Sequence, residues 1–185
     1  METLISAGYG LGMEQPQHTT TSTPKPLELP AQDVLQTIDK RSFATLATTS
    51  EAGWPHAAGV LYALSGDHLY VSTLRSSRKA RNIAADPRVA VTVPVRRAPI
   101  GPPSTIIFQT TARVLDLDDP ELRAAATSGD LKAVTSHGEL ELPGGVFLQI
   151  ALPRKVVTYG LGMSLLSLIR EPMNAAGYSK LVPGS

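Results

Sequence analysis

Three short strands separated by tight turns constrain the fold of this chain more than any other feature. Apolar residues alternate with small or polar ones over residues 43–48, 56–64 and 68–73, which is the period of a strand with one buried face. The turns between them centre on residues 51–53 and 65–67, and both contain glycine. Parallel strands need crossover connections of a dozen or more residues, so these turns predict an antiparallel meander and exclude a doubly wound parallel sheet.

The remaining elements follow from the same periodicities. Helices are predicted after Pro30, after Ser76 or Ser77, and after Asp119, where capping residues or a first-turn proline precede apolar positions at helical spacing. Further strands are predicted at residues 88–93, 104–115 and 146–152. Six short strands broken by short helices indicate a mainly β fold with short helices (β/α+β), built as a small closed or split barrel.

Length and composition indicate one folded domain with tails. The chain has 185 residues, 42% of them hydrophobic and 18% charged, which suits a single globular domain rather than a disordered chain. Residues 15–30 are rich in proline and threonine and cannot bury enough apolar surface to order themselves. We therefore predict a flexible arm at 1–30, a barrel at 31–162, and a helix with a tail at 163–185.

One pentapeptide, Tyr-Gly-Leu-Gly-Met, occurs twice, at residues 9–13 and 159–163. Repeat architectures need at least three copies at a fixed period, so this is not one of them. Two interpretations stay open: chance identity between glycine-rich segments, and an arm that imitates an internal docking segment.

Several classes of protein are excluded by what the sequence lacks. The chain has no cysteine, which removes disulfides, thiolate catalysis and iron–sulfur ligation. No uncharged apolar stretch approaches the roughly 20 residues of a membrane span, so we expect no membrane span and a cytoplasmic protein. The histidine and two carboxylates at 137–141 have no specific metal-ligand spacing and are interpreted as a solvated loop, so no metal is predicted.

Basic residues gather between Arg75 and Arg97, although the whole chain has a net charge of only +1. This stretch holds seven basic residues and one acid, a net charge of +6. Hydroxyl residues followed by Arg78 and Lys79 at the start of a helix suit a bound phosphate, because the free backbone N–H groups and the helix dipole favour an anion there. A solvated basic helix face is the alternative, and nucleic-acid binding is disfavoured by the near-neutral chain.

Three segments within this region resemble the phosphate-binding signature of a known family. They are Tyr-Val-Ser-Thr at 70–73, Ser-Arg-Lys-Ala-Arg-Asn-Ile at 77–83 and Asp-Pro-Arg-Val-Ala-Val at 86–91. The family is that of the pyridoxamine 5′-phosphate oxidase-like split barrels, and the resemblance is to its flavin/deazaflavin oxidoreductase branch. The closing segment 153–160 also falls where the family has a comparable feature, and the resemblance spans roughly residues 31–162.

The resemblance implies a six-stranded antiparallel split β-barrel that forms a homodimer, with a cofactor site at each side of the subunit interface. The cofactor would be FMN or coenzyme F420. Its phosphate would lie at Thr73, Ser77, Arg78 and Lys79, and its ring along the backbone of Ala58, Gly59, Val60 and Leu61. Gln109 and Tyr159 would face the ring from the partner subunit.

The same resemblance implies an oxidoreductase that passes hydride or electrons to a small organic acceptor. The second strand, Gly59–Leu64, carries no cation for a substrate phosphate, so oxidation of pyridoxamine 5′-phosphate itself is not expected. The alternative is a flavin- or haem-binding split-barrel protein without turnover. No side chain is singled out as a catalytic acid or base.

Overall fold

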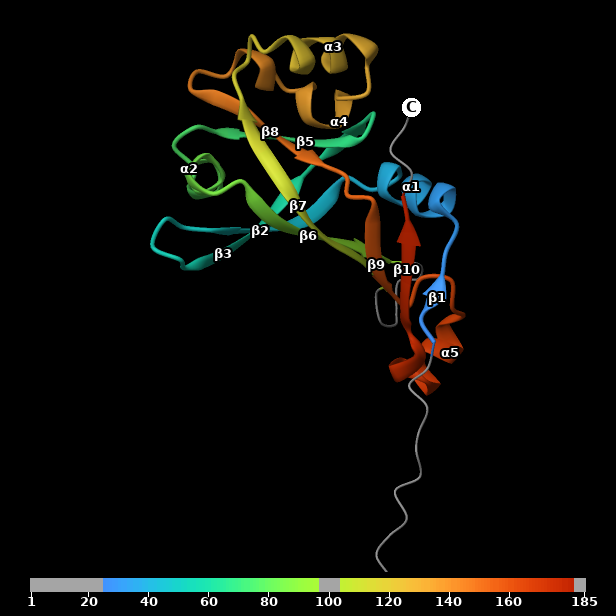
Figure 1. Cartoon of the computed structure of the whole chain (residues 1–185). Coiled ribbons are helices and arrows are strands. Elements are labelled where there is room, and N and C mark those ends of the chain that lie inside the picture. The colour runs from blue at the N-terminus through green and yellow to red at the C-terminus, as the bar shows by residue number, and fades with distance from the viewer. Residues whose placement is uncertain (1–24, 97–103, 182–185) are drawn as a thin grey trace, which may run out of the picture.

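The computed structural model describes residues 25–96 and 104–181, and within them the chain forms a strongly curled antiparallel sheet with short helices (Figure 1). The strands are β1 (Leu27–Glu28), β2 (Phe43–Thr49), β3 (Pro55–Leu61), β4 (Ala63–Ser65), β5 (His68–Leu74), β6 (Arg88–Val95), β7 (Ser104–Leu115), β8 (Gly145–Ala151), β9 (Lys155–Tyr159) and β10 (Ala176–Lys180). The helices are α1 (Ala31–Asp39), α2 (Arg78–Ala85), α3 (Pro120–Ser128), α4 (Lys132–Thr135) and α5 (Leu165–Arg170), with 3₁₀ turns η1 (Glu139–Glu141) and η2 (Pro172–Asn174).

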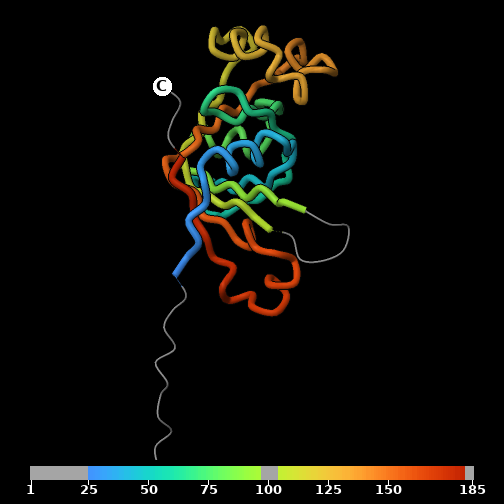
Figure 2. The backbone as a smooth tube through the Cα atoms, turned by 90° about the vertical axis from the view of Figure 1, so that its right-hand side faces the viewer, coloured from blue at the N-terminus to red at the C-terminus, as the bar shows by residue number. Residues whose placement is uncertain are grey.

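The long strand β7 joins the two parts of the barrel. Its first half pairs with β9 and its last residues pair with β8, while β6 runs antiparallel along most of its length. One path of neighbouring strands runs β1-β10-β9-β7-β6-β2-β3, and β8 carries β5 and β4 on the other side. Figure 2 shows α3 and α4 over one end of the barrel and α5 at the other. The predicted mainly β, antiparallel split-barrel class is confirmed.

The barrel core is made by the inward-facing residues of these strands together with α1 and α2. On β2 and β6, every second residue is buried, as the alternating pattern predicts. Tyr62 is 1% exposed, and its hydroxyl donates a 2.7 Å hydrogen bond to the carbonyl of Ile38 at the end of α1. Burial raises the pKa of Tyr62 well above its ordinary value. This residue therefore fixes α1 against the barrel.

The opposite side of the sheet, which we call the outer face, is exposed or half-buried over five strands. The register aligns its central row, Val157–Ile107–Thr92–Thr45–Gly59, from β9 to β3. Other uncharged members alternate with the core residues on the same strands: Phe43, Ala47, Ala57, Leu61, Ala90, Gln109 and Tyr159. The charged side chains of Arg88 on β6 and Lys155 on β9 lie on the same face, away from this row. A wide face with small and apolar side chains at its centre is typical of a surface that binds another protein.

Three details differ from the sequence prediction. The described residues form ten strands rather than six, partly because the predicted strand 56–64 is interrupted at Tyr62, which separates β3 from β4. The segment predicted as a C-terminal helix and tail contains α5 but also β10. β1 pairs in parallel with β10, and Glu28 accepts a 2.8 Å hydrogen bond from the Tyr178 hydroxyl. The sheet thus includes residues on both sides of 31–162, whose boundaries stay predictions.

Candidate functional site

A cleft of about 450 Å³ opens between β3, β5, the first turn of α2 and the segment that follows α4. We call it the β3–β5 cleft. It is lined by Gly59, Val60, Leu61, Val71, Ser72, Thr73, Leu74, Lys79, Ala133, Val134, His137, Glu139 and Leu142. Five of the residues predicted to bind the cofactor, which lie on three separate elements, therefore line one cavity: Gly59, Val60, Leu61, Thr73 and Lys79.

The start of α2 presents hydroxyl and amino groups at one end of this cleft. Ser77 caps the helix, and its Oγ accepts a hydrogen bond from the backbone N–H of Ala80 at 3.3 Å. The Thr73 hydroxyl donates to the same Oγ at 3.2 Å, so the two hydroxyls lie together. Lys79 lines the cleft, whereas Arg78 is exposed and lies outside the lining. A helix start with hydroxyls and an ammonium group can bind a phosphate group.

α2 is held in place by packing and by one buried hydrogen bond. Ala80 and Ile83 are buried in the barrel core. The Asn82 side-chain amide donates to the Thr48 hydroxyl on β2 at 2.9 Å, and both residues are at most 6% exposed. The position of Lys79 is therefore determined by contacts on the opposite face of its own helix.

Gly59 lies on the β3 side of the cleft beside an aromatic ring of the neighbouring strand. A Cβ atom at this position would lie 3.0 Å from two ring atoms of Phe43. The Phe43 ring thus packs over Gly59 on the outer face, and a side chain at this position would require the ring to move. Ala58, which was predicted with these residues, is half-buried and lies outside the lining.

The segment after α4 supplies a wall that the sequence analysis did not predict. His137 and Glu139, interpreted above as part of a solvated loop, both line the cleft. The Glu139 carboxylate accepts a 2.8 Å hydrogen bond from the His137 backbone N–H, which lowers the pKa of Glu139. Its other oxygen lies 3.6 Å from His137 Nδ1. The spacing of these residues in the sequence did not predict a place in the cleft, because strand pairing between distant parts of the chain brings this segment there.

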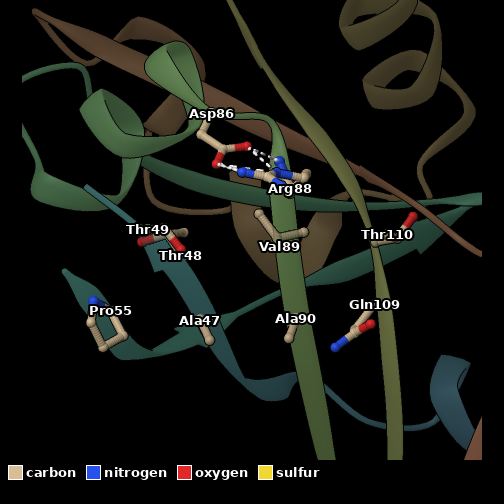
Figure 3. Close-up of a pocket in the computed structure, with 10 residues that line it drawn as sticks. All are labelled: Ala47, Thr48, Thr49, Pro55, Asp86, Arg88, Val89, Ala90, Gln109 and Thr110. Atoms are coloured by element: carbon tan, nitrogen blue, oxygen red, sulfur yellow. Dashed lines mark hydrogen bonds and ion pairs between the residues drawn. The ribbon is translucent and has the colours of Figure 1, made fainter. Parts of the chain in front are cut away.

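Gln109 and Tyr159 lie away from the β3–β5 cleft. Gln109 lines a second pocket of about 490 Å³ on β2, β6 and β7 (Figure 3). At its edge Arg88 forms an ion pair with Asp86 at 2.7 Å, and these hydrogen bonds lower the pKa of Asp86 to about 2. Tyr159 is exposed at the end of β9, four strands from β3 on the outer face. One subunit alone does not bring either residue to the cleft.

The basic stretch is dispersed by the fold. Arg75 forms an ion pair with Asp116, and Arg88 forms one with Asp86. Arg81 donates to the backbone carbonyl of Ser76. Of the six basic residues of this stretch that the structure describes, Lys79 lines the β3–β5 cleft. Arg97, the seventh, lies outside the described residues, as does the first Tyr-Gly-Leu-Gly-Met segment at 9–13.

The strand order and the curled sheet define a split β-barrel. The sequence model described as pyridoxamine 5′-phosphate oxidase matches residues 31–151. The chain therefore belongs to the pyridoxamine 5′-phosphate oxidase family, which confirms the resemblance inferred from its motifs. No curated protein sequence matches it significantly.

Several solved structures have the same fold. A heme binding protein from Mycobacterium smegmatis has a TM-score of 0.60 and 23% identity, over 71% of this chain and 55% of its own length. HutZ, a heme storage protein from Vibrio cholerae, has a TM-score of 0.58 and 16% identity, over 68% and 91%. An FAD-binding protein from Mesorhizobium loti has a TM-score of 0.52 and 23% identity, over 68% and 91%. At these identities the similarity establishes the fold.

No helix in the parts of the chain that the structure describes is long and apolar enough to cross a membrane. Nor do residues 25–96 and 104–181 contain a group of three or more histidine, aspartate or glutamate side chains placed to hold a metal ion.

Proposed function

We propose that this protein is an oxidoreductase that binds FMN or coenzyme F420 in the β3–β5 cleft and passes hydride or electrons to a small organic acceptor. One observation carries the proposal: the cleft gathers Gly59, Val60 and Leu61 with Thr73 and Lys79. The sequence motifs assigned the first three to a ring and the last two to a phosphate. The cofactor would supply the redox chemistry, and the protein would orient it and shape the acceptor pocket.

Each part of the cleft suits one part of such a cofactor. Lys79, Thr73 and the Ser77 cap would hold the phosphate, with Arg78 reaching it from the exposed start of α2. The ring would lie along the backbone of β3 at Gly59, Val60 and Leu61, which line the cleft. The cleft residues of β3 carry no cation for a second phosphate, which supports an acceptor other than pyridoxamine 5′-phosphate.

A homodimer would complete the site from the outer face. The uncharged row from Val157 to Gly59, exposed except for the half-buried Thr92, is suited to pack against a second copy. Tyr159 and Gly59 lie near opposite edges of this face. A two-fold axis parallel to the strands would exchange these edges, so Tyr159 of each subunit would approach the cleft of the other. We therefore include the dimer in the proposed function.

Ligand titration tests the proposal. The purified protein is titrated separately with FMN and F420, and binding is followed by the cofactor fluorescence. We expect micromolar or tighter binding of one of them, and at least a tenfold loss when Arg78→Ala and Lys79→Ala are combined, since two charge-assisted contacts are removed. Arg123→Ala, an exposed substitution on α3 outside the cleft, is the matched control. The proposal fails if neither cofactor binds, or if the double variant binds like the control.

Haem binding without turnover is the second candidate, because the imidazole of His137 lines the cleft beside apolar residues. Imidazole is a common axial ligand of haem iron. Two of the structural neighbours above are named for haem. Titration with haemin distinguishes the candidates: a sharp Soret band at stoichiometric haemin that is lost in His137→Ala would favour haem, and saturable flavin fluorescence changes without it would favour the oxidoreductase.

A further inference from the structure

The wall formed by the segment after α4 brings a protonatable side chain to the β3–β5 cleft. β5 pairs with β8 so that Leu74 lies opposite Gly145, which places the chain just before β8 beside the end of β5. His137, Glu139 and Leu142 line the cleft from this segment. These three residues therefore form a wall of the cleft separate from the start of α2, and they are distant from α2 in the sequence.

Glu139 lies beside the His137 ring. One of its carboxylate oxygens accepts from the His137 backbone N–H at 2.8 Å, and the other lies 3.6 Å from Nδ1. This second distance is longer than a hydrogen bond, so the contact does not assign the proton of the neutral ring to either nitrogen. A protonated imidazole carries an N–H donor on both nitrogens and a positive charge.

Few other charges surround this ring. Among the residues that line the cleft, the charged ones besides His137 are Lys79 from α2 and Glu139 from η1, and β3, β5 and β8 contribute none. Lys132 of α4 and Glu141 of η1 are exposed and lie outside the lining. A ligand oxygen in the cleft would therefore find two side-chain cations, Lys79 and the protonated His137.

We propose that His137, beside Lys79 in the lining of the cleft, is a ligand-binding residue, whose imidazolium donates a hydrogen bond to a phosphate or ring carbonyl oxygen of the cofactor. This inference rests on the proposed function, because it requires a cofactor in the β3–β5 cleft. Its consequence is a pH dependence: the contact is charge-assisted only when the ring is protonated, so the cofactor binds more tightly at acidic pH.

The first experiment measures the dissociation constant of whichever of FMN or F420 the wild type binds, at pH 5.5 and at pH 8.0. We expect His137→Ala to weaken binding about tenfold at pH 5.5, the worth of one charge-assisted hydrogen bond, and less than threefold at pH 8.0. Titration of the cofactor's own phosphate affects both proteins alike, so it cancels in the ratio. His68→Ala is the matched control, since His68 also lies beside a carboxylate, Asp67 at 2.6 Å, but outside this cleft.

The second experiment observes the histidine directly. In a protein with labelled histidines, addition of the cofactor should shift the ring resonances of His137 and leave those of His68 in place. Because the His137 side chain is exposed, its removal should not change the melting temperature. Binding that is equal in wild type and His137→Ala at both pH values, or an unshifted His137 resonance, would overturn the inference alone. Absence of any cofactor binding by the wild type would overturn the proposed function with it.

Discussion

The hydrogen bond between Asn82 and Thr48 should be critical for the position of α2. It joins two side chains that are 6% and 3% exposed, with 2.9 Å between Asn82 Nδ2 and Thr48 Oγ1. Asn82→Ala leaves the Thr48 hydroxyl buried without this donor, and Thr48→Val leaves the Asn82 amide without its acceptor. Removing one partner leaves the other buried without a hydrogen bond, so the free energy of taking that group out of water is no longer compensated.

The burial of both side chains sets the expected loss of unfolding free energy. Each single variant should lose about 2 kcal/mol of unfolding free energy, from a range of about 1–3 kcal/mol for an unpaired buried polar group. For a chain of this length that corresponds to a fall of roughly 4–8 °C in melting temperature. The double variant leaves no unpaired group, so it should cost about 1 kcal/mol less than the sum of the two singles.

Urea denaturation of the four proteins measures this coupling. The same four proteins are then titrated with the cofactor, and we expect Asn82→Ala to weaken binding several-fold because Lys79 lies on the helix that it releases. A coupling energy within about 0.3 kcal/mol of zero would show that the two groups are independent and would refute the reasoning. Unchanged cofactor affinity in Asn82→Ala would refute the link between this contact and the anchor.

Three further outcomes are expected. Gly59→Ala should lower cofactor affinity about tenfold or more in fluorescence titration, while the half-exposed Phe43 ring moves aside and the melting temperature falls by only a few degrees. Asp86 has a pKa lowered from 3.8 to about 2 by its hydrogen bonds with Arg88, so its carboxylate stabilises the fold above about pH 4 and loses this effect as the pH falls towards 2. Asp86→Asn should therefore melt below the wild type at pH 6, and the difference should close between pH 4 and 2. Ile107→Glu places a charge in the middle of the outer face, and sedimentation should show a monomer where the wild type is a dimer; a wild-type monomer would contradict the dimer itself.

Local sequence patterns predicted the elements whose formation depends on neighbours in the chain. The turns at 51–53 and 65–67 predicted the early meander, and of the two predicted caps, Ser76 and Ser77, it is Ser77 that caps α2. The prediction of Gly59 and Lys79 depended on motif resemblance. The structure brings them to one cleft, but their binding role stays a prediction.

Two features that local sequence patterns did not predict, the cleft wall at 137–141 and the strand break at Tyr62, depend on contacts between residues far apart in the chain. The pairing of Leu74 with Gly145 brings His137 and Glu139 to the cleft, and no spacing within 137–141 encodes it. Tyr62 continues the strand pattern in sequence, yet its hydroxyl reaches Ile38 on α1 and the strand is interrupted there. These elements depend on partners at least 24 positions away, which periodicity does not report.

The fold also changes what the basic stretch can bind. A site for nucleic acid needs several cations aligned along a phosphate backbone, and its affinity falls steeply with salt because each neutralised phosphate releases a counterion. Here Arg75 is paired with Asp116 and Arg88 with Asp86, while Lys79 lines a cleft. Among the residues of this stretch that the structure describes, these charges are therefore split among separate contacts instead of forming a continuous track. An anion that reaches Lys79 also meets the Ser77 cap and β3, so the stretch is suited to one small phosphate-bearing ligand rather than a polyanion.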